Sequence, residues 1–345
     1  MTSGAAVAAA DLTPQRTPFV GLLVALASAA TFGSSGTFGQ ALLASGWSPG
    51  AIVTARITGA ALVMLVPAAL AMHGHWHLLR RNIGRIIAYG IFAVAGCQFA
   101  YFMAVDRLSV GVALLLEYLA PVLIVGWVWA RHGRRPSRLT TAGVGAAIIG
   151  LVLVLDVTSG ARLDVVGVAW GLLAAIGLVV FFLVAADEEE SLPPISFAGG
   201  GLAVGAVGLL VVAALGVLPM EATTSSVDLA GWSAPWWVAI VELAVVAGAL
   251  AYASGIAAAR LLGGTVASFV GLSEVLFAIV FAWLVVGEAM SPVQAAGGLA
   301  VLAGVIAVKL GEREVAGGPL PTDDVDTALL GRDEETDLAQ PARVH

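Results

Sequence analysis

The chain has 345 residues, of which 59% are hydrophobic and only 11% are charged, and its formal net charge is −7. A soluble domain carries about 25% charged residues, so this composition excludes an ordinary soluble enzyme or binding domain and favours a protein of the lipid bilayer. The single cysteine, Cys97, excludes an intramolecular disulfide. Much of the net charge falls in one tail, so it indicates no particular partner.

Ten apolar stretches follow one another between Phe19 and Leu310, and each is long enough to cross a bilayer. A helix needs roughly 20 apolar residues to cross a core about 30 Å thick. The stretches lack the strict alternation of barrel strands, so we predict helices. The predicted spans are 19–40, 49–72, 83–104, 109–130, 139–157, 164–186, 196–217, 235–257, 264–286 and 291–310.

The residues before the first span lack the basic start and the cleavage site of a signal peptide, so we expect this span to be retained. If residues 1–17 are a cytoplasmic tail, the arginine-rich loops at 80–85 and 131–138 fall on the same side of the membrane. The opposite side then receives only Arg107 and Arg162. Because Lys and Arg concentrate in cytoplasmic loops, both termini are predicted to be cytoplasmic.

The segment 311–345 is acidic, contains several Gly and Pro residues and is almost free of aromatic residues. Such a composition cannot bury enough apolar surface to offset the entropy of folding. We therefore expect a disordered cytoplasmic tail. A regulatory or partner-binding tail is the alternative.

The two halves of the chain resemble each other at a constant offset of 154 residues. This offset places Trp129 on Trp283, and it also places Gly143 on Gly297 and Gly150 on Gly304. Each half holds five predicted spans, and five is an odd number, so the second half must insert upside down relative to the first. The expected fold is an all-α integral membrane protein with ten transmembrane helices. These form two inverted five-helix repeats, at 18–157 and 163–310, an architecture typical of secondary transporters.

Two runs carry a resemblance to a known family, VGVALLLEYLAPVLIVGWVW in the first half and RLLGGTVASFVGLSEVLFAIVFAWLVVGEAMSPVQAAGGLAVLAGVIAV in the second. The chain resembles the drug/metabolite transporter superfamily, in its EamA-type branch, over roughly 18–310. The Gly-Glu pair at 287–288 is similar to the end of the family's second repeat, whereas the first repeat has Gly133–Arg134–Arg135 instead. The resemblance implies export of amino acids or other small metabolites across the bacterial plasma (inner) membrane, and it does not fix the substrate.

Four predicted spans contain an ionisable residue, namely Arg56, Glu117, Glu242 and Glu274. Each costs at least about 2.5–3.5 kcal/mol at the bilayer centre, so such residues usually face a cavity and have a function. At about 1.5 Å per residue, the first three lie at one level. We therefore expect Arg56 to pair with Glu117 or Glu242, either in a substrate site or as an ion pair that locks helices together. Glu242 has a second alternative, since it lies close enough to a helix start to snorkel toward the interface.

Glu274 lies near the predicted midplane, where the sequence offers no obvious partner. It is the candidate to carry a coupling proton or to bind an ammonium group of the substrate. Pro121 follows Glu117 by one turn and predicts a broken helix, and broken helices in transporters offer free carbonyls to substrates or ions.

Uncharged polar residues extend this candidate site. Ser35 continues a helical stripe with Ser28 and Thr31, which either lines a cavity or joins helices. Gln98 and Tyr101 share a helix face, and they either contact the substrate or satisfy each other.

Several kinds of chemistry have no residues to support them. The motifs HExxH, GxxxxGKS and CxxC are missing from the sequence, and we expect no enzyme, no catalytic residue and no cofactor. His73, His75 and His77 alternate in a loop, and we expect no metal site there. Without an ATP motif, transport must follow a gradient.

We therefore predict a secondary transporter that exports amino acids or related small metabolites, with proton antiport as one mechanism. The alternatives are an importer or facilitator of another solute, such as a drug or nucleoside, and a non-transporting membrane scaffold or sensor. The expected partners are a small-molecule substrate and membrane lipid, with no nucleic acid. The oligomeric state stays open between monomer and homodimer.

Overall fold

The computed structural model describes residues 17–74, 76–132, 137–155, 164–185, 192–262 and 270–316. Residues 1–16 of the predicted N-terminal tail (1–17) and residues 317–345 of the predicted disordered tail (311–345) lie outside these ranges, as do Arg134, Arg135 and Arg162. The last helix continues to Ala316, six residues beyond the predicted end of the tenth span.

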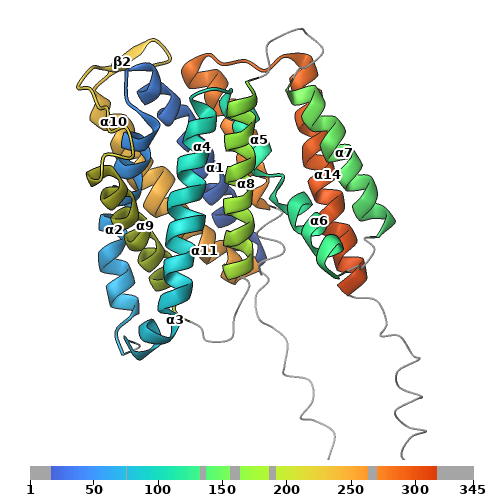
Figure 1. Cartoon of the computed structure of the whole chain (residues 1–345), viewed down its shortest axis with the longest axis horizontal. Helices are drawn as coiled ribbons and strands as arrows, with labels where there is room; N and C mark the ends of the chain where they lie inside the picture. Colours follow the sequence, from blue (N-terminus) through green and yellow to red (C-terminus); the bar gives the residue numbers. More distant parts are fainter. Residues whose placement is uncertain are drawn as a thin grey trace, which may run out of the picture.

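The first half of the chain is helical throughout its described part (Figure 1). Its elements are α1 (Thr17–Ala44), α2 (Pro49–Ala71), α3 (Trp76–Ala88), the π-helix η1 (Tyr89–Gly96), α4 (Cys97–Val105), α5 (Val110–Glu117), α6 (Ala120–His132) and α7 (Arg138–Val154). Three serines begin helices by accepting a backbone N–H with their side chains, as N-cap residues do. They are Ser48 before α2, Ser109 before α5 and Ser137 before α7.

The second half adds one small hairpin to its helices. Its elements are α8 (Val165–Ala185), α9 (Pro194–Ala214), β1 (Val227–Leu229), β2 (Trp232–Ala234), α10 (Trp236–Val241), the π-helix η3 (Glu242–Leu250), α11 (Ala251–Leu262), α13 (Ser273–Phe281), the π-helix η4 (Ala282–Val286) and α14 (Pro292–Ala316).

The helical prediction for a membrane protein is confirmed. Seven described helical segments are long and apolar enough to cross a membrane, judged by length and composition. Three further apolar segments are shorter, at Arg138–Val154, Val165–Val180 and Ser273–Val286. Each predicted span overlaps one of these segments, and residues 264–269 of the ninth predicted span lie outside the described residues.

The hairpin β1–β2 is an addition that the sequence analysis did not anticipate. Its two-residue turn, Ala230 and Gly231, has positive φ at both positions, 57° and 79°, which matches the twist of antiparallel strands. Asp228 accepts a hydrogen bond from the Gly231 N–H at 2.8 Å. The hairpin lies at the end of the bundle opposite α3 (Figure 1).

The helices α7 and α14 form a tightly packed antiparallel pair at one side of the bundle (Figure 1). Glycines allow the two backbones to touch. A Cβ on Gly143 would lie 2.6 Å from the Gly304 carbonyl oxygen, and a Cβ on Gly150 would lie 2.6 Å from that of Gly297. Small residues at such a contact are the usual means of close helix packing in lipid.

The remaining helices pack in matching ways in the two halves. Helix α1 of the first half packs against α11 and α13 of the second, and α8 of the second half packs against α4 and α5 of the first. The π-helices also correspond, since the offset of 154 carries Tyr89–Gly96 onto 243–250, inside η3. The main hydrophobic core extends through both halves.

Candidate functional site

Two spans are interrupted in the interior of the bundle. Helix α5 ends at Glu117, a turn at 118–119 follows, and α6 begins at Ala120 with Pro121 as its second residue. Proline has no backbone N–H to continue a helix, so the break that Pro121 predicts is present. In the second half of the chain, α13 begins at Ser273 directly after a turn at Leu272. Glu117 and Glu274 therefore lie at helix ends rather than inside unbroken helices.

The two interruptions contact each other through Tyr118. Its hydroxyl donates a hydrogen bond to Glu274 Oε2 at 2.9 Å and lies 3.3 Å from the Gly271 carbonyl oxygen. The expectation that Glu274 has no partner is therefore wrong. Tyr118 was not among the predicted site residues, although its position between Glu117 and Pro121, beside the predicted break, was a signal that could have identified it.

Glu117 is buried, with 7% of its surface exposed. Cys97, the first residue of α4, lies with its Sγ 3.4 Å from Glu117 Oε1 and 3.3 Å from the Ala174 carbonyl oxygen. Cys97 thus links the carboxylate on α5 to the backbone of α8. The sequence analysis used Cys97 only to exclude a disulfide and missed this contact.

Arg56 is almost fully buried, at 1% exposure, and its partners differ from those expected. Its guanidinium donates to Gln98 Oε1 on α4 and, at 3.0 Å, to the Ala247 carbonyl oxygen in η3. It also lies 5.7 Å from the centre of the Phe102 ring. Within the described ranges no ion pair joins Arg56 to Glu117 or Glu242, so the predicted pairing is wrong.

The Ala247 carbonyl explains how part of a buried guanidinium is satisfied without a carboxylate, whereas Arg56 Nε has no hydrogen-bond partner among the described residues. Ala247 lies near the point where η3 passes into α11. Helical backbone at such a junction departs from the regular ladder of hydrogen bonds. A carbonyl there is available to a side chain, and a hydrogen bond from a charged donor is stronger than one between neutral groups.

Glu242 lies at the start of η3 and contacts α1. Its Oε1 accepts a hydrogen bond from the Ser34 hydroxyl, and its buried Oε2 has no hydrogen-bond partner among the described residues. One residue earlier on α1, Gly33 passes close to α13, because a Cβ there would lie 2.9 Å from the Glu274 carbonyl oxygen. Helix α1 therefore runs between the segments that carry Glu242 and Glu274.

The predicted hydroxyl stripe on α1 does not act as one surface. Ser28 donates to the Ala251 carbonyl oxygen at 2.9 Å and joins α1 to α11. Thr31 bonds to carbonyls of its own helix. Ser35 is buried at 4% exposure, and its hydroxyl has no partner within the described chain.

Gln98 and Tyr101 have separate surroundings. The Gln98 side chain is engaged by Arg56. Tyr101 is buried, packs its ring edge toward Phe102 with centroids 5.4 Å apart, and directs its hydroxyl toward Gly36. Both residues lie on α4 beside α1 and α2, close to the charged groups described above.

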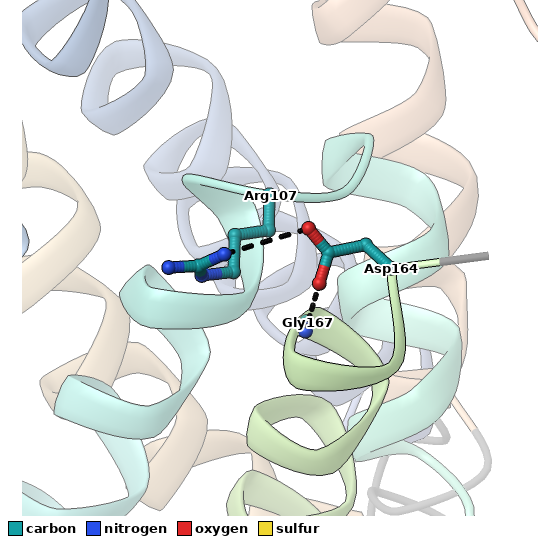
Figure 2. A network of polar contacts seen from close by, with 3 residues as sticks. All are labelled: Arg107, Asp164 and Gly167. Atoms are coloured by element: carbon teal, nitrogen blue, oxygen red, sulfur yellow. Dashed lines mark hydrogen bonds and ion pairs between the residues drawn. The ribbon is translucent and has the colours of Figure 1, made fainter. Parts of the chain in front are cut away.

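A second group of charges lies at the ends of helices. Asp164 begins α8, where its Oδ1 accepts the Gly167 N–H at 2.8 Å and its Oδ2 lies 3.5 Å from Arg107 (Figure 2). The Gly167 N–H, and then Arg107, lower the pKa of Asp164 below its ordinary value. Both side chains are more than a third exposed, so this pair ties the halves together at the surface rather than in the interior.

Glu288, in the Gly-Glu pair after η4, caps another helix. Its Oε2 accepts the Val110 N–H at the start of α5 at 3.2 Å, and the Gln40 side chain on α1 lies close enough to act on its carboxylate. Burial raises the pKa of Glu288 above its ordinary value. No cluster of three or more His, Cys, Asp or Glu side chains that could hold a metal ion occurs in the part of the chain that the structure describes.

Comparisons with known proteins agree with this architecture. The family model described as the EamA-like transporter family matches the chain twice, over residues 19–156 and 165–310. An uncharacterized inner membrane transporter, YicL of Salmonella typhimurium (strain LT2), is 24% identical over 303 residues, which is 86% of this chain and 97% of the relative. A crystal structure of 21% identity shares the fold, with a TM-score of 0.54 over 86% of this chain and 98% of the other.

The two successive matches suggest duplicated halves, and together they cover most of the chain. A transporter family also excludes an enzyme. The chain is therefore a multi-pass membrane transporter and belongs to the EamA-like transporter family.

Proposed function

We propose that the protein is a secondary transporter of the bacterial inner membrane that exports amino acids or related small metabolites by proton antiport. The observation that carries this proposal is the meeting of Glu117, Tyr118 and Glu274 at two interrupted spans, one from each half. Interrupted helices at a repeat interface are where such transporters bind substrate and coupling ions. Arg56 adds a buried cation close by, and a zwitterionic substrate needs groups of both signs.

The proposed architecture is ten spans in two inverted repeats, at 18–157 and 163–310. The glycine contacts between α7 and α14 support it. At the offset of 154, Gly297 is the counterpart of Gly143, and Gly304 is the counterpart of Gly150. Each glycine of α7 contacts the counterpart of the other one. A two-fold axis between antiparallel helices produces this exchange, and inverted repeats have such an axis in the membrane plane.

The proposed orientation places both termini in the cytoplasm, because the arginine-rich loops then face inward. Reporters that are active only in the periplasm or only in the cytoplasm, fused after Ser137 and after Ser291, should give opposite readings. Ser137 should be inside. Equal readings from the two sites would contradict the inverted architecture.

In this proposal Glu274 carries the coupling proton or binds the substrate's ammonium group, and Glu117 is the second candidate for that role. Arg56, held by Gln98, faces the substrate's carboxylate. Glu242, Tyr101 and Ser35 border the same space, and Pro121 keeps the α5–α6 break open. Each of these residues lies on a helix that carries Glu117 or Glu274, that packs against such a helix, or that packs against one of its neighbours.

The test is Glu274→Gln, which keeps the shape of the side chain and removes its titration. We expect normal membrane insertion, with flux in everted vesicles that is lost or no longer depends on pH, measured with a panel of radiolabelled amino acids. Pro121→Ala should cause a milder loss, because it alters the helix break without changing charge. Wild-type flux with an unchanged pH profile in Glu274→Gln would remove Glu274 from the mechanism and favour Glu117. Uptake into right-side-out vesicles without efflux activity would instead indicate an importer.

A further inference from the structure

We propose that one face of α1, formed by Ser34, Thr37 and Gln40 and called here the α1 polar stripe, lines a narrow water-filled path from Glu288 to Glu242. Its use as a proton path rests on the proposed function, whereas its existence as a path does not. Glu288 lies at the end of the bundle that carries the hairpin, since the hairpin turn donates from the Ala230 N–H to the Val285 carbonyl oxygen, three residues before Glu288.

The stripe has a carboxylate at each end. Its residues recur every three positions, so they follow one side of the helix, and Ser34 and Gln40 are about 9 Å apart along the axis at 1.5 Å per residue. Ser34 donates to Glu242 in η3. The Gln40 side chain lies close enough to Glu288 to act on its carboxylate. Two carboxylates from different segments thus lie beside the same face of α1.

Thr37 lies between these ends, and its hydroxyl is free. A threonine or serine within a helix commonly bonds to a carbonyl one turn earlier, as Thr31 and Ser34 do on the same helix. Thr37 is 0% exposed, and its Oγ1 has no partner in the described ranges. Its hydroxyl is therefore available to a group outside its own helix.

Two more oxygens along the path lack partners. They are Gln40 Oε1 and Glu242 Oε2, and both are buried. A buried polar atom without a hydrogen bond costs about 1–3 kcal/mol, and ordered water is the usual remedy where several such atoms lie close together. The hydroxyl, the amide oxygen and the carboxylate oxygen are spread along a stripe that is about 9 Å long, so they would serve as partners for a row of waters rather than for a single one.

The groups around the two carboxylates suit this assignment. From α2, Arg56 acts electrostatically on Glu242. From α5, the Val110 N–H binds Glu288, which is half-buried and so retains contact with the surface. In proton transfer along the path, Glu288 accepts a proton from a hydronium ion in bulk water and releases it to a water in the path, which passes one of its own protons to the Thr37 hydroxyl. The hydroxyl releases its own proton toward Glu242. Each step forms one O–H bond and breaks one.

Silver ions test the path, because Ag⁺ is small, travels in water and reacts with thiolates. Thr37→Cys in sealed vesicles that expose the hairpin end is treated briefly with Ag⁺ and then denatured. The unblocked thiol is measured with N-ethylmaleimide by peptide mass spectrometry, with native Cys97 as an internal reference. Leu42→Cys is the matched control, since Leu42 is also 0% exposed and lies on the same helix in an apolar setting. We expect blocking of Thr37→Cys to be at least about tenfold faster, because a thiol in dry apolar surroundings rarely ionises.

Equal blocking rates for Thr37→Cys and Leu42→Cys would overturn the path. If Thr37→Cys does not accumulate, Gln40→Cys occupies the next position of the stripe, and the same rule applies to it. The blocking assay does not depend on transport. If the protein transports a solute but the thiol of Thr37→Cys is not blocked, the path is refuted and the proposed function is not. A blocked thiol without flux of any solute would refute the proposed function alone.

The proton role has its own test in Thr37→Val, which keeps the branched shape and removes the hydroxyl. We expect proton release coupled to amino-acid flux in proteoliposomes, followed with a trapped pH-sensitive dye, to fall several-fold in Thr37→Val and to recover in Thr37→Ser. Full proton-coupled flux in Thr37→Val would overturn the role of the stripe in proton movement.

Discussion

The α7–α14 contact and the contact between Tyr118 and Glu274 both join the two halves of the chain, and they do so with different chemistry. In the first, glycines bring backbone against backbone, with Gly143 opposite Gly304 and Gly150 opposite Gly297. In the second, a hydroxyl and a carboxylate meet where two spans are interrupted.

We expect this difference to separate a structural contact from a functional one. A backbone contact with no room for a Cβ has one arrangement, so it holds the halves in a fixed relation. A hydrogen bond between a tyrosine and a carboxylate can be broken and formed again at small cost, because its net free energy is only about 0.5–3 kcal/mol. We therefore expect changes at the α7–α14 contact to affect folding. Changes at the contact between Tyr118 and Glu274 should affect transport more than stability.

The largest expected effect is that of Gly150→Val. The added Cβ would lie 2.6 Å from both the Gly297 carbonyl oxygen and the Val301 backbone nitrogen, and neither atom can move without its helix. We expect little folded protein in the membrane, measured by immunoblotting and fluorescence-detected size-exclusion chromatography. Gly145→Val is the matched control on α7, because a Cβ there meets nothing within 4 Å. Similar loss in both variants would mean that helix propensity, rather than the contact, sets the effect.

The next effect is that of Arg56→Leu, which leaves Gln98 Oε1 and the Ala247 carbonyl oxygen without their donor. Each stranded acceptor costs about 1–3 kcal/mol, so the Tm of the purified protein should fall clearly. Adding Gln98→Leu should recover more of this Tm than adding Glu117→Leu, because the structure pairs Arg56 with Gln98. Greater recovery with Glu117→Leu would restore the ion pair that the sequence suggested.

A smaller change in stability is expected for Tyr118→Phe, which removes the hydroxyl and keeps the ring. Its lost hydrogen bond is worth about 0.5–3 kcal/mol, yet flux should fall strongly because Glu274 loses the group that orients it. Tyr252→Phe is the control, since the Tyr252 ring packs edge-on against Phe32 with centroids 5.0 Å apart. Its hydroxyl forms no hydrogen bond to a described residue, so Tm and flux should stay close to wild type. Unchanged flux in Tyr118→Phe would show that the contact between Tyr118 and Glu274 is structural, like the α7–α14 contact.

The smallest effect is expected for Asp164→Asn at the exposed pair with Arg107. Asparagine can still accept the Gly167 N–H, so only the ionic contact is lost, and exposed pairs contribute little. Because the pKa of Asp164 is lowered in the folded state, its stabilising contribution is present above its ordinary value of 3.8 and is lost as the pH falls through the lowered pKa. The Tm difference between wild type and Asp164→Asn should therefore shrink on acidification and in high salt. A difference that grows at low pH would contradict this assignment.

The spans and the break at Pro121 could be predicted because they depend on local sequence. Apolar length decides membrane insertion, and a proline interrupts a helix wherever it lies. The partner of Arg56 could not be predicted in this way. Depth alone placed Glu117 and Glu242 beside it, whereas its actual partner in η3, the Ala247 carbonyl, depends on a π-helix for which the sequence offers no simple signal.

Ser34 and Ala230 also have roles that the sequence alone did not predict. Ser28, Thr31 and Ser35 follow a regular helical spacing, yet Ser34, beside that stripe, is the residue that reaches Glu242. The rotation of α1 about its axis decides this, and neighbouring helices set that rotation through contacts such as Gly33 against α13. The hairpin was also missed, because its turn uses Ala230 at a positive φ instead of the usual Asn.

The matched π-helices η1 and η3 bear on the origin of the chain. A π-helix holds more residues per turn than the α-helix around it, so it is a local irregularity of the backbone. Both halves contain this irregularity at corresponding positions, 89–96 and 243–250. If the halves are duplicated, as the two family matches suggest, an irregularity present in the single copy would appear in both halves. Arg56, Glu117, Glu242 and Glu274 have no charged counterpart 154 residues away, so the two halves share this backbone irregularity and differ in these charges.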